Sequence, residues 1–123
     1  MPRLVVARAA EAIDFYREVF GARELERHTT EDGHIVHAAL ALGDAVLGVT
    51  GAAPHWHNHD PLALGGSPVI FNVMVDDPVA VADEVARRGG EVIFPVRDHD
   101  YGFREGRVRD PFGHLWTVSK PIR

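Results

Sequence analysis

Apolar and polar positions along this chain follow two periods, and these periods change in a fixed order. Residues 4–6 form a short apolar run, and in the next segment Ile13, Tyr16 and Val19 recur at helical spacing before Gly21. A short apolar run is typical of a strand, the spaced pattern is typical of an amphipathic helix, and glycine is a common helix stop. The pattern therefore predicts a strand followed by a helix.

Three stretches expected to be strands, separated by turn-forming dipeptides, come next. The turn signals are Asp32-Gly33 and Gly43-Asp44. The strands are expected at 23–31, 34–42 and 45–50. The first half therefore predicts a βαβββ unit.

The same order recurs after a connector rich in proline, glycine and histidine. Asp77-Pro78 supplies a helix start, and Gly89-Gly90 supplies its end. The strands of this half are expected at 67–75, 91–96, 106–110 and 114–119. We therefore expect one domain over 1–123, with a first βαβββ module at about 1–50, a connector at 51–67 and a second module at 68–123. Each four-stranded module is too small to bury both faces of its sheet, which favours packing between modules and a homodimer.

Composition narrows the choice of chemistry. The 123 residues are 46% hydrophobic and 25% charged, with a net charge of −5 and no cysteine. Without cysteine, a metal would need His, Asp or Glu ligands. The basic residues form no block, no apolar run is long enough to span a bilayer, and there is no signal-peptide layout, phosphate loop or Gly-x-Ser-x-Gly elbow. We therefore expect a cytoplasmic protein with no nucleic-acid or membrane partner.

Six short motifs occur in an order and spacing that resemble a known superfamily. They are "AIDFYREVFGA", "GDAVL", "GGSPV", "VDDP", "YGFREG" and "DPFGHLW". The chain resembles the vicinal oxygen chelate superfamily, of glyoxalase/bleomycin-resistance/dioxygenase type, and most closely its PhnB-like branch. The resemblance implies an α+β fold, with paired βαβββ modules forming curled mixed sheets around a cavity, usually in a homodimer. Members include metal-dependent isomerases and dioxygenases, thiol transferases, and metal-free proteins that sequester antibiotics.

The resemblance also implies where a metal would bind. The superfamily's four ligand positions fall here on Met1, Leu47 or Gly48, Ile70 and Thr117. Only the threonine hydroxyl is a ligand, and it is a weak one. We therefore expect no metal cofactor.

The segment "PHWHNHDP" offers an alternative metal site. On an extended strand His55, His57 and His59 would share one face and could chelate a divalent metal. They lie between two prolines in the connector, however, where loops are commonly polar and exposed. The sequence favours a solvated loop over a metal site.

Strand parity selects the candidate pocket residues. In 34–42 the even positions predict packed core, whereas the odd positions are mostly small and leave room around His37. His37 could be a base or a hydrogen-bond donor, or it could be structural. The resemblance places Ile70 toward the cavity, so Asn72 and Thr117 are expected to point inward too. The same parity turns Trp116 toward the helix and packing.

Three more residues are candidates for ligand contact. Tyr101 and Arg104, in an expected hairpin loop, could close the cavity mouth, or they could belong to a surface turn. Trp56 could reach across a dimer interface. The PhnB-like pattern has acids where Phe103 and Ala39 stand here. If those acids carry chemistry in relatives, their absence favours binding over catalysis.

The sequence thus predicts a metal-free protein that sequesters or carries an apolar or aromatic small molecule. The ligand-binding candidates are His37, Asn72, Tyr101, Arg104, Thr117 and Trp56. The alternative is an enzyme, a lyase, isomerase or dioxygenase, with His37 as base or with a divalent metal in an atypical site.

Overall fold

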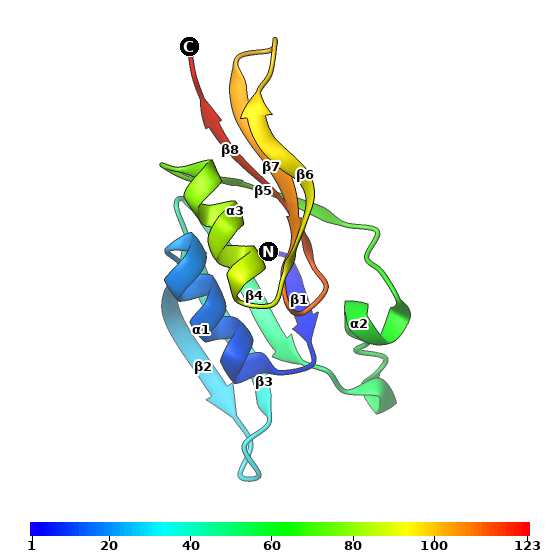
Figure 1. The fold of residues 1–123 in the computed structure, drawn as a ribbon. Helices are drawn as coiled ribbons and strands as arrows, with labels where there is room; N and C mark the ends of the chain where they lie inside the picture. The colour runs from blue at the N-terminus through cyan, green and yellow to red at the C-terminus, as the bar shows by residue number, and fades with distance from the viewer. The chain divides into compact units, whose positions relative to one another are not determined.

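A computed structural model describes the whole chain, residues Met1–Arg123. The chain forms two compact units, Met1–Gly65 and Gly66–Arg123 (Figure 1). Each unit contains one four-stranded sheet and one long helix. No helix in either unit is long and apolar enough to cross a lipid bilayer.

The first unit has the predicted order of elements. They are β1 (Arg3–Val6), α1 (Ala9–Phe20), β2 (Arg23–Thr29), β3 (Ile35–Leu42) and β4 (Ala45–Gly51), followed by the short helices η1 (Pro54–Trp56) and α2 (Pro61–Leu64). The strands lie in the order β1-β4-β3-β2. β1 is parallel to β4, and the other pairs are antiparallel. The predicted βαβββ unit is confirmed, whereas the one-turn helix α2 was not predicted.

The second unit repeats this arrangement. Its elements are β5 (Ile70–Met74), α3 (Pro78–Arg87), β6 (Glu91–Asp98), β7 (Phe103–Arg109) and β8 (Leu115–Pro121). The strand order is β5-β8-β7-β6, with β5 parallel to β8. The chain is therefore an α+β protein with two mixed sheets, as predicted.

Both long helices begin and end where the sequence signals lie. Gly21 ends α1 with φ 77°, a left-handed conformation that glycine adopts without steric strain. At the start of α3 the Asp77 side chain accepts a hydrogen bond from the Ala80 backbone N–H at 3.1 Å. Pro78 follows at the first helical position, where its missing N–H is not needed.

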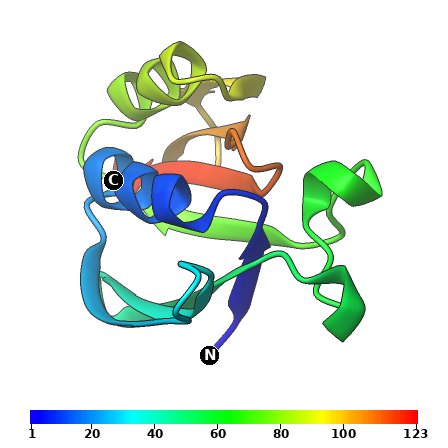
Figure 2. The same ribbon diagram turned by 90° about the horizontal axis from the view of Figure 1, so that it is seen from below.

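One face of each sheet packs beneath its own helix (Figure 2). In the first unit the predicted even-numbered core residues Ala38 and Leu40 are buried. Leu42 is only half-buried. Val36 is 37% exposed, because the register shifts between His28 and Thr29 and leaves Val36 without a partner on β2. The buried apolar residues of the second unit's strands are Val73, Val108, Trp116 and Val118. Side chains of the opposite parity lie on the face away from the helix, which we call the open face. On the second sheet most of them are exposed or half-buried, whereas on the first sheet Ile35 and Ala39 are buried.

The turn before β8 is built around a buried carboxylate. Asp110 is 1% exposed, and its side chain accepts hydrogen bonds from the backbone N–H groups of Phe112 and His114. Its other oxygen accepts a hydrogen bond from Trp116 Nε1 at 2.9 Å. Buried polar groups need such partners. The expectation that Trp116 serves packing is confirmed.

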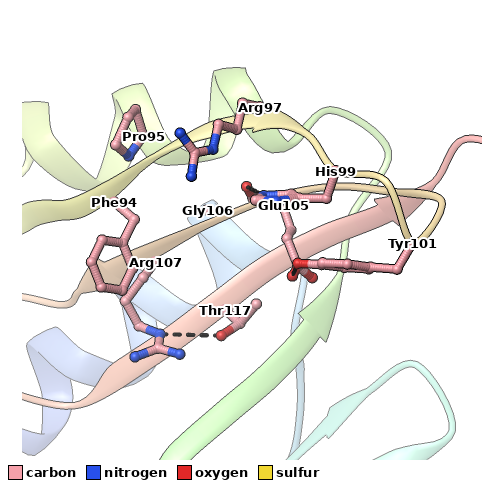
Figure 3. A pocket seen from close by; sticks show the side chains of 9 residues that line it. All are labelled: Phe94, Pro95, Arg97, His99, Tyr101, Glu105, Gly106, Arg107 and Thr117. Carbon is pink, nitrogen blue, oxygen red and sulfur yellow. Dashed lines mark hydrogen bonds between the residues drawn. The ribbon is translucent and has the colours of Figure 1, made fainter.

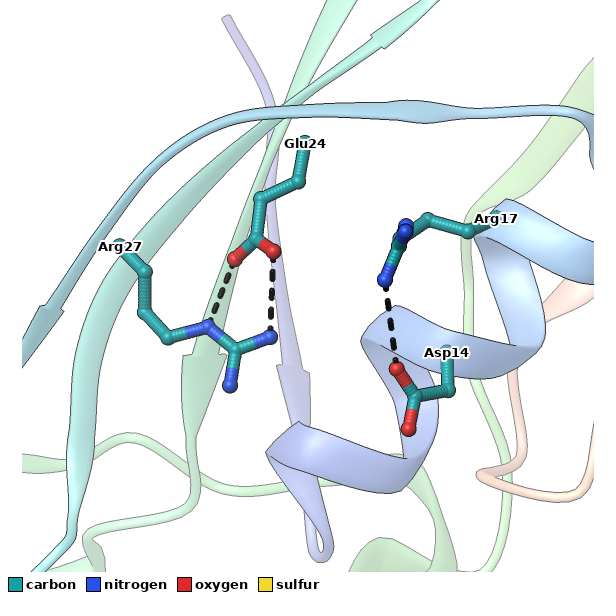
Figure 4. Close-up of polar contacts among 4 residues, drawn as sticks. All are labelled: Asp14, Arg17, Glu24 and Arg27. Atoms are coloured by element: carbon teal, nitrogen blue, oxygen red, sulfur yellow. Dashed lines mark hydrogen bonds and ion pairs between the residues drawn. The ribbon is translucent and has the colours of Figure 1, made fainter.

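Exposed ion pairs lie on the surface of the first unit, but they do not determine its fold. Arg27 Nε donates to Glu24 at 2.6 Å on β2, and Arg17 lies 3.6 Å from Asp14 on α1 (Figure 4). Exposed pairs of this kind stabilise a protein by at most about 1 kcal/mol.

The β6–β7 hairpin is longer than the sequence pattern predicted. We expected strands at 91–96 and 106–110, but β6 continues to Asp98 and β7 begins at Phe103. The expected loop around Arg104 is therefore strand. Cross-strand hydrogen bonds hold polar residues in a strand even where apolar and polar positions do not alternate.

Candidate functional site

A pocket of about 320 Å³ lies on the open face of the second sheet. It is formed by β6, β7 and β8 and by the turn between β6 and β7 (Figure 3). The lining residues are Phe94, Pro95, Arg97, His99, Tyr101, Glu105, Gly106, Arg107 and Thr117. Exposed aromatic rings and convergent polar groups are typical of small-molecule sites.

A second pocket adjoins the first on the same face. It shares Tyr101, Glu105 and Thr117 with the first pocket and extends over β5. Its other lining residues are Asn72, Met74, Phe103 and Ser119. The structure therefore brings three candidates from the sequence, Asn72, Tyr101 and Thr117, to one continuous surface. Asn72 is exposed, so its amide does not need a protein partner.

An irregularity in β6 shapes the pocket. In the β6–β7 register Phe94 pairs with Arg107, and Arg97 pairs with Glu105. Between these two pairs β6 has one more residue than β7. This bulge turns both Phe94 and Arg97 toward the pocket, whereas regular alternation would put them on opposite faces. Gly106 allows the bulge to approach, because a Cβ there would lie 2.7 Å from the Phe94 carbonyl oxygen.

Polar contacts fix the two ends of the pocket. At one end Arg107 Nε donates a hydrogen bond to Thr117 Oγ1 at 3.2 Å, and the guanidinium lies 5.6 Å from the centre of the Phe94 ring. At the other end the Tyr101 hydroxyl donates to the Glu105 carboxylate, which raises the pKa of Tyr101. The rings of His99 and Tyr101 stack at 5.0 Å. Figure 3 shows these two groups on either side of Thr117.

Arg104 does not line either pocket. It lies next to Glu105 on β7, and adjacent strand residues point to opposite faces. Its guanidinium binds Asp98 on β6 at 2.7 and 3.3 Å. This pairing lowers the pKa of Asp98 and raises the pKa of Arg104. The expectation that Arg104 sits at a pocket mouth with Tyr101 came from treating a strand as a loop.

Sequence reasoning missed Glu105 and Arg107. The segment 106–110 was expected to be a strand, so alternation alone could have separated the two faces of β7. The alignment of Arg107 with Thr117, however, depends on the β7–β8 register, which the sequence pattern does not state.

His37 lies on the open face of the first sheet among other polar side chains. Its Nε2 is 3.6 Å from Glu26, whose other oxygen is 3.4 Å from His28 Nε2. The two imidazole rings stack at 6.2 Å. His37 Nδ1 is buried and has no hydrogen-bond partner. The sequence signal for this cluster is the alternation of Glu26 and His28 on β2, which points both side chains to one face.

The residues at the superfamily's metal positions do not fit a divalent metal. Leu47 pairs with Leu40 on the helix-covered face, so Gly48 is the open-face residue of this part of β4, and it has no side chain. Thr117 accepts its hydrogen bond from the positively charged Arg107, which would repel a cation. No three His, Asp or Glu side chains are grouped so that they could hold a metal ion.

The three histidines of the connector do not lie on an extended strand. Residues Pro54–Trp56 form the 3₁₀ helix η1, and His57 has φ 64°. A bridge between Ala53 and Asn58 closes the turn. His55, His57 and His59 are exposed, and Trp56 is 56% exposed beside the His55 ring. The shared face that chelation required is therefore absent.

Comparison with known proteins agrees with this fold. The family model described as "Glyoxalase/Bleomycin resistance protein/Dioxygenase superfamily" matches residues 2–118. The chain is 38% identical to the uncharacterized protein Mb0911c of Mycobacterium bovis, over 99% of this chain and 82% of the relative. It is 27% identical to a lactoylglutathione lyase of Neisseria meningitidis, over 90% and 81% of the two chains.

A solved structure supports the same assignment. The crystal structure of TioX from Micromonospora sp. ML1 matches with a TM-score of 0.71 and 26% identity, over 99% of this chain and 98% of that one. The match of the family model to almost the whole chain agrees with the repeated βαβββ order. This protein belongs to the glyoxalase/bleomycin resistance protein/dioxygenase superfamily.

Proposed function

We propose that this protein binds a small, apolar or aromatic organic molecule on the open face of the second sheet and sequesters or carries it without a metal. The observation that carries the proposal is the pair of adjoining pockets there. Exposed Phe94 and Tyr101 offer ring surface, while Thr117 and Asn72 offer polar contacts. Such a mixture fixes both the affinity and the orientation of a small ligand.

A fragment screen followed by nuclear magnetic resonance tests the proposal. Aromatic fragments are expected to shift backbone amide signals of β6, β7 and β8. Thr117→Leu, which removes the central hydroxyl and fills space, is expected to weaken binding by about tenfold, or about 1.4 kcal/mol. Thr29→Leu, on an exposed position of β2, is the matched control and should leave binding unchanged. Equal binding by both variants would contradict the proposed site.

Turnover separates a carrier from an enzyme. After incubation with the protein, a sequestered ligand is recovered unchanged by mass spectrometry, whereas an enzyme converts it. The family is compatible with both outcomes, because one fold hosts several functions.

A second candidate function is a metal-free enzyme with His37 as general base. The observation that favours it is the Glu26 carboxylate 3.6 Å from His37 Nε2, because a carboxylate can orient an imidazole. In that case His37→Ala should lower turnover by about 10²- to 10⁴-fold, whereas a binder should lose only modest affinity. Turnover that survives His37→Ala would exclude His37 as the base.

A further inference from the structure

Strand β7 carries three arginines, and they have different partners. Arg104 and Arg109 each bind the carboxylate that faces them on β6, Asp98 and Glu91 respectively. Arg107 faces Phe94 instead. Its contacts are a neutral hydroxyl, that of Thr117, and an aromatic ring. The two outer charges of β7 are neutralised within the sheet, whereas the charge in the pocket is not.

A second guanidinium strengthens the positive character of the pocket. Arg97 lines it from β6 and takes part in none of the chain's ion pairs. Glu105 is the single carboxylate among the lining residues, and it accepts the hydrogen bond of the Tyr101 hydroxyl. The lining therefore contains two arginines and one glutamate, although the net charge of the whole chain is −5. A positive pocket on an acidic protein favours an anionic ligand.

The shape of the site narrows the kind of anion. Arg107 uses Nε on Thr117, which leaves its two terminal nitrogens to donate in parallel. A carboxylate accepts two parallel hydrogen bonds from a guanidinium. The nearby Glu105 carboxylate would repel a dianionic phosphate more strongly than a singly charged carboxylate. Phe94 and Tyr101 are 58% and 61% exposed, so their rings have surface for a flat apolar group.

We propose that the pocket takes an aromatic carboxylate, with the carboxylate on Arg107 and the ring against Phe94 and Tyr101. This inference rests on the proposed function and names the class of its ligand. It also follows from the misfit to a metal: at Thr117, where the superfamily resemblance implies a metal ligand, a fixed guanidinium supplies the positive charge. The positive charge that binds the ligand oxygens would then belong to a side chain.

A matched pair of probes tests the charge. In calorimetric titrations of the wild-type protein, 2-naphthoate should bind at least about tenfold more tightly than 2-naphthamide, which has the same ring and no charge. A third probe, 2-naphthyl phosphate, should bind no more tightly than 2-naphthoate. These comparisons use one protein and do not depend on any variant folding.

Variants of β7 test whether Arg107 binds the carboxylate. Arg107→Gln should weaken 2-naphthoate binding by about tenfold or more and leave 2-naphthamide binding nearly unchanged. Arg107→Lys, which keeps the charge but loses the planar pair of donors, should give an intermediate affinity. Arg104→Gln, on the same strand but the opposite face, is the control and should leave both affinities unchanged.

Each outcome distinguishes the inference from the proposed function. If naphthamide binds as tightly as naphthoate, or if Arg107→Gln leaves naphthoate affinity intact, the carboxylate assignment is wrong and the binding pocket stands. If 2-naphthyl phosphate binds more tightly than 2-naphthoate, the carboxylate assignment is wrong and the pocket takes an aromatic phosphate. If no probe or screened fragment shifts the signals of β6, β7 and β8, both the inference and the proposed function fail.

Discussion

The hydroxyl of Tyr101 donates a hydrogen bond to Glu105, and this contact controls the charge of the pocket at high pH. The bond favours the neutral phenol over the phenolate, so it raises the pKa of Tyr101. Because the folded-state pKa is raised, the contribution of this bond to stability is complete below the ordinary tyrosine pKa of about 10. It is lost as the pH rises through the raised pKa. A neutral phenol also avoids adding a second negative charge beside Glu105.

Replacement of Glu105 is expected to lower the pKa of Tyr101. In Glu105→Gln the negative charge is gone, so the phenolate should form at lower pH than in the wild type. Absorbance titration of the phenolate measures this shift, and the chain has only two tyrosines. Tyr101→Phe identifies the signal, because it leaves only Tyr16, which is 2% exposed. An unchanged titration in Glu105→Gln would show that the hydrogen bond does not form in solution.

Single residues show where local rules succeed and where they fail. Alternation placed Ala38 and Leu40 in the core and put Asn72 and Thr117 on one face, because side-chain direction in a strand has a period of two. The expected position of Arg104 at a pocket mouth was wrong, because its segment was taken for a loop. Parity is a guide only once the strand has been recognised, and a register shift such as the one beside Val36 interrupts it even there.

At the scale of elements, the pocket depends on the close approach of β6 and β7. Gly106 on β7 lies against the bulge of β6, and a Cβ there would come within 2.8 Å of the Val96 backbone nitrogen. Backbone atoms cannot rotate away as a flexible side chain can. The bulge and the glycine therefore belong together, and both shape the pocket wall that carries Phe94 and Arg97.

Gly106→Ala is expected to separate β6 from β7 and to destabilise the fold by about 1–3 kcal/mol, as overpacking does. Urea denaturation measures the loss, and weaker binding of aromatic fragments should accompany it. Gly66→Ala is the control, because no atom lies within 4 Å of a Cβ there. Equal stability of the two variants would mean that the hairpin absorbs the extra methyl group without strain.

At the scale of the whole molecule, we expect a homodimer. In each unit the long helix packs against one face of the sheet. At β5, an edge strand of the second sheet, Val69 and Ile70 are both 48% exposed, and neither lines the two pockets described above. Exposed apolar side chains that lie together are typical of association surfaces.

Sedimentation analysis should therefore give a mass twice that of one chain. Ile70→Glu, which puts a charge on the open face of β5, should shift the equilibrium toward the monomer. Leu64→Glu, at a 65% exposed position at the end of α2, is the control and should leave the mass unchanged. A monomeric wild-type protein across the concentration range would contradict the prediction.

By itself the sequence determined the elements and their order. Helix caps such as Asp77-Pro78, the stop at Gly21 and the alternation of apolar residues are local signals, since propensity and burial act over a few neighbouring positions. They were sufficient for the repeated βαβββ order and for the family resemblance. Local signals did not determine the length of the β6–β7 hairpin, because cross-strand hydrogen bonds hold its polar ends together.

Only the tertiary structure decided the site. Arg107 lies beside Thr117, and Phe94 beside Arg107, because of strand register and of a bulge in β6. These contacts join residues distant in sequence, and one residue of slip would point each side chain to the other face. The same register gave Arg104 an acidic partner and left Arg107 without one. The neighbours of Arg107 that support the proposed anion-binding pocket therefore depend on how the strands align.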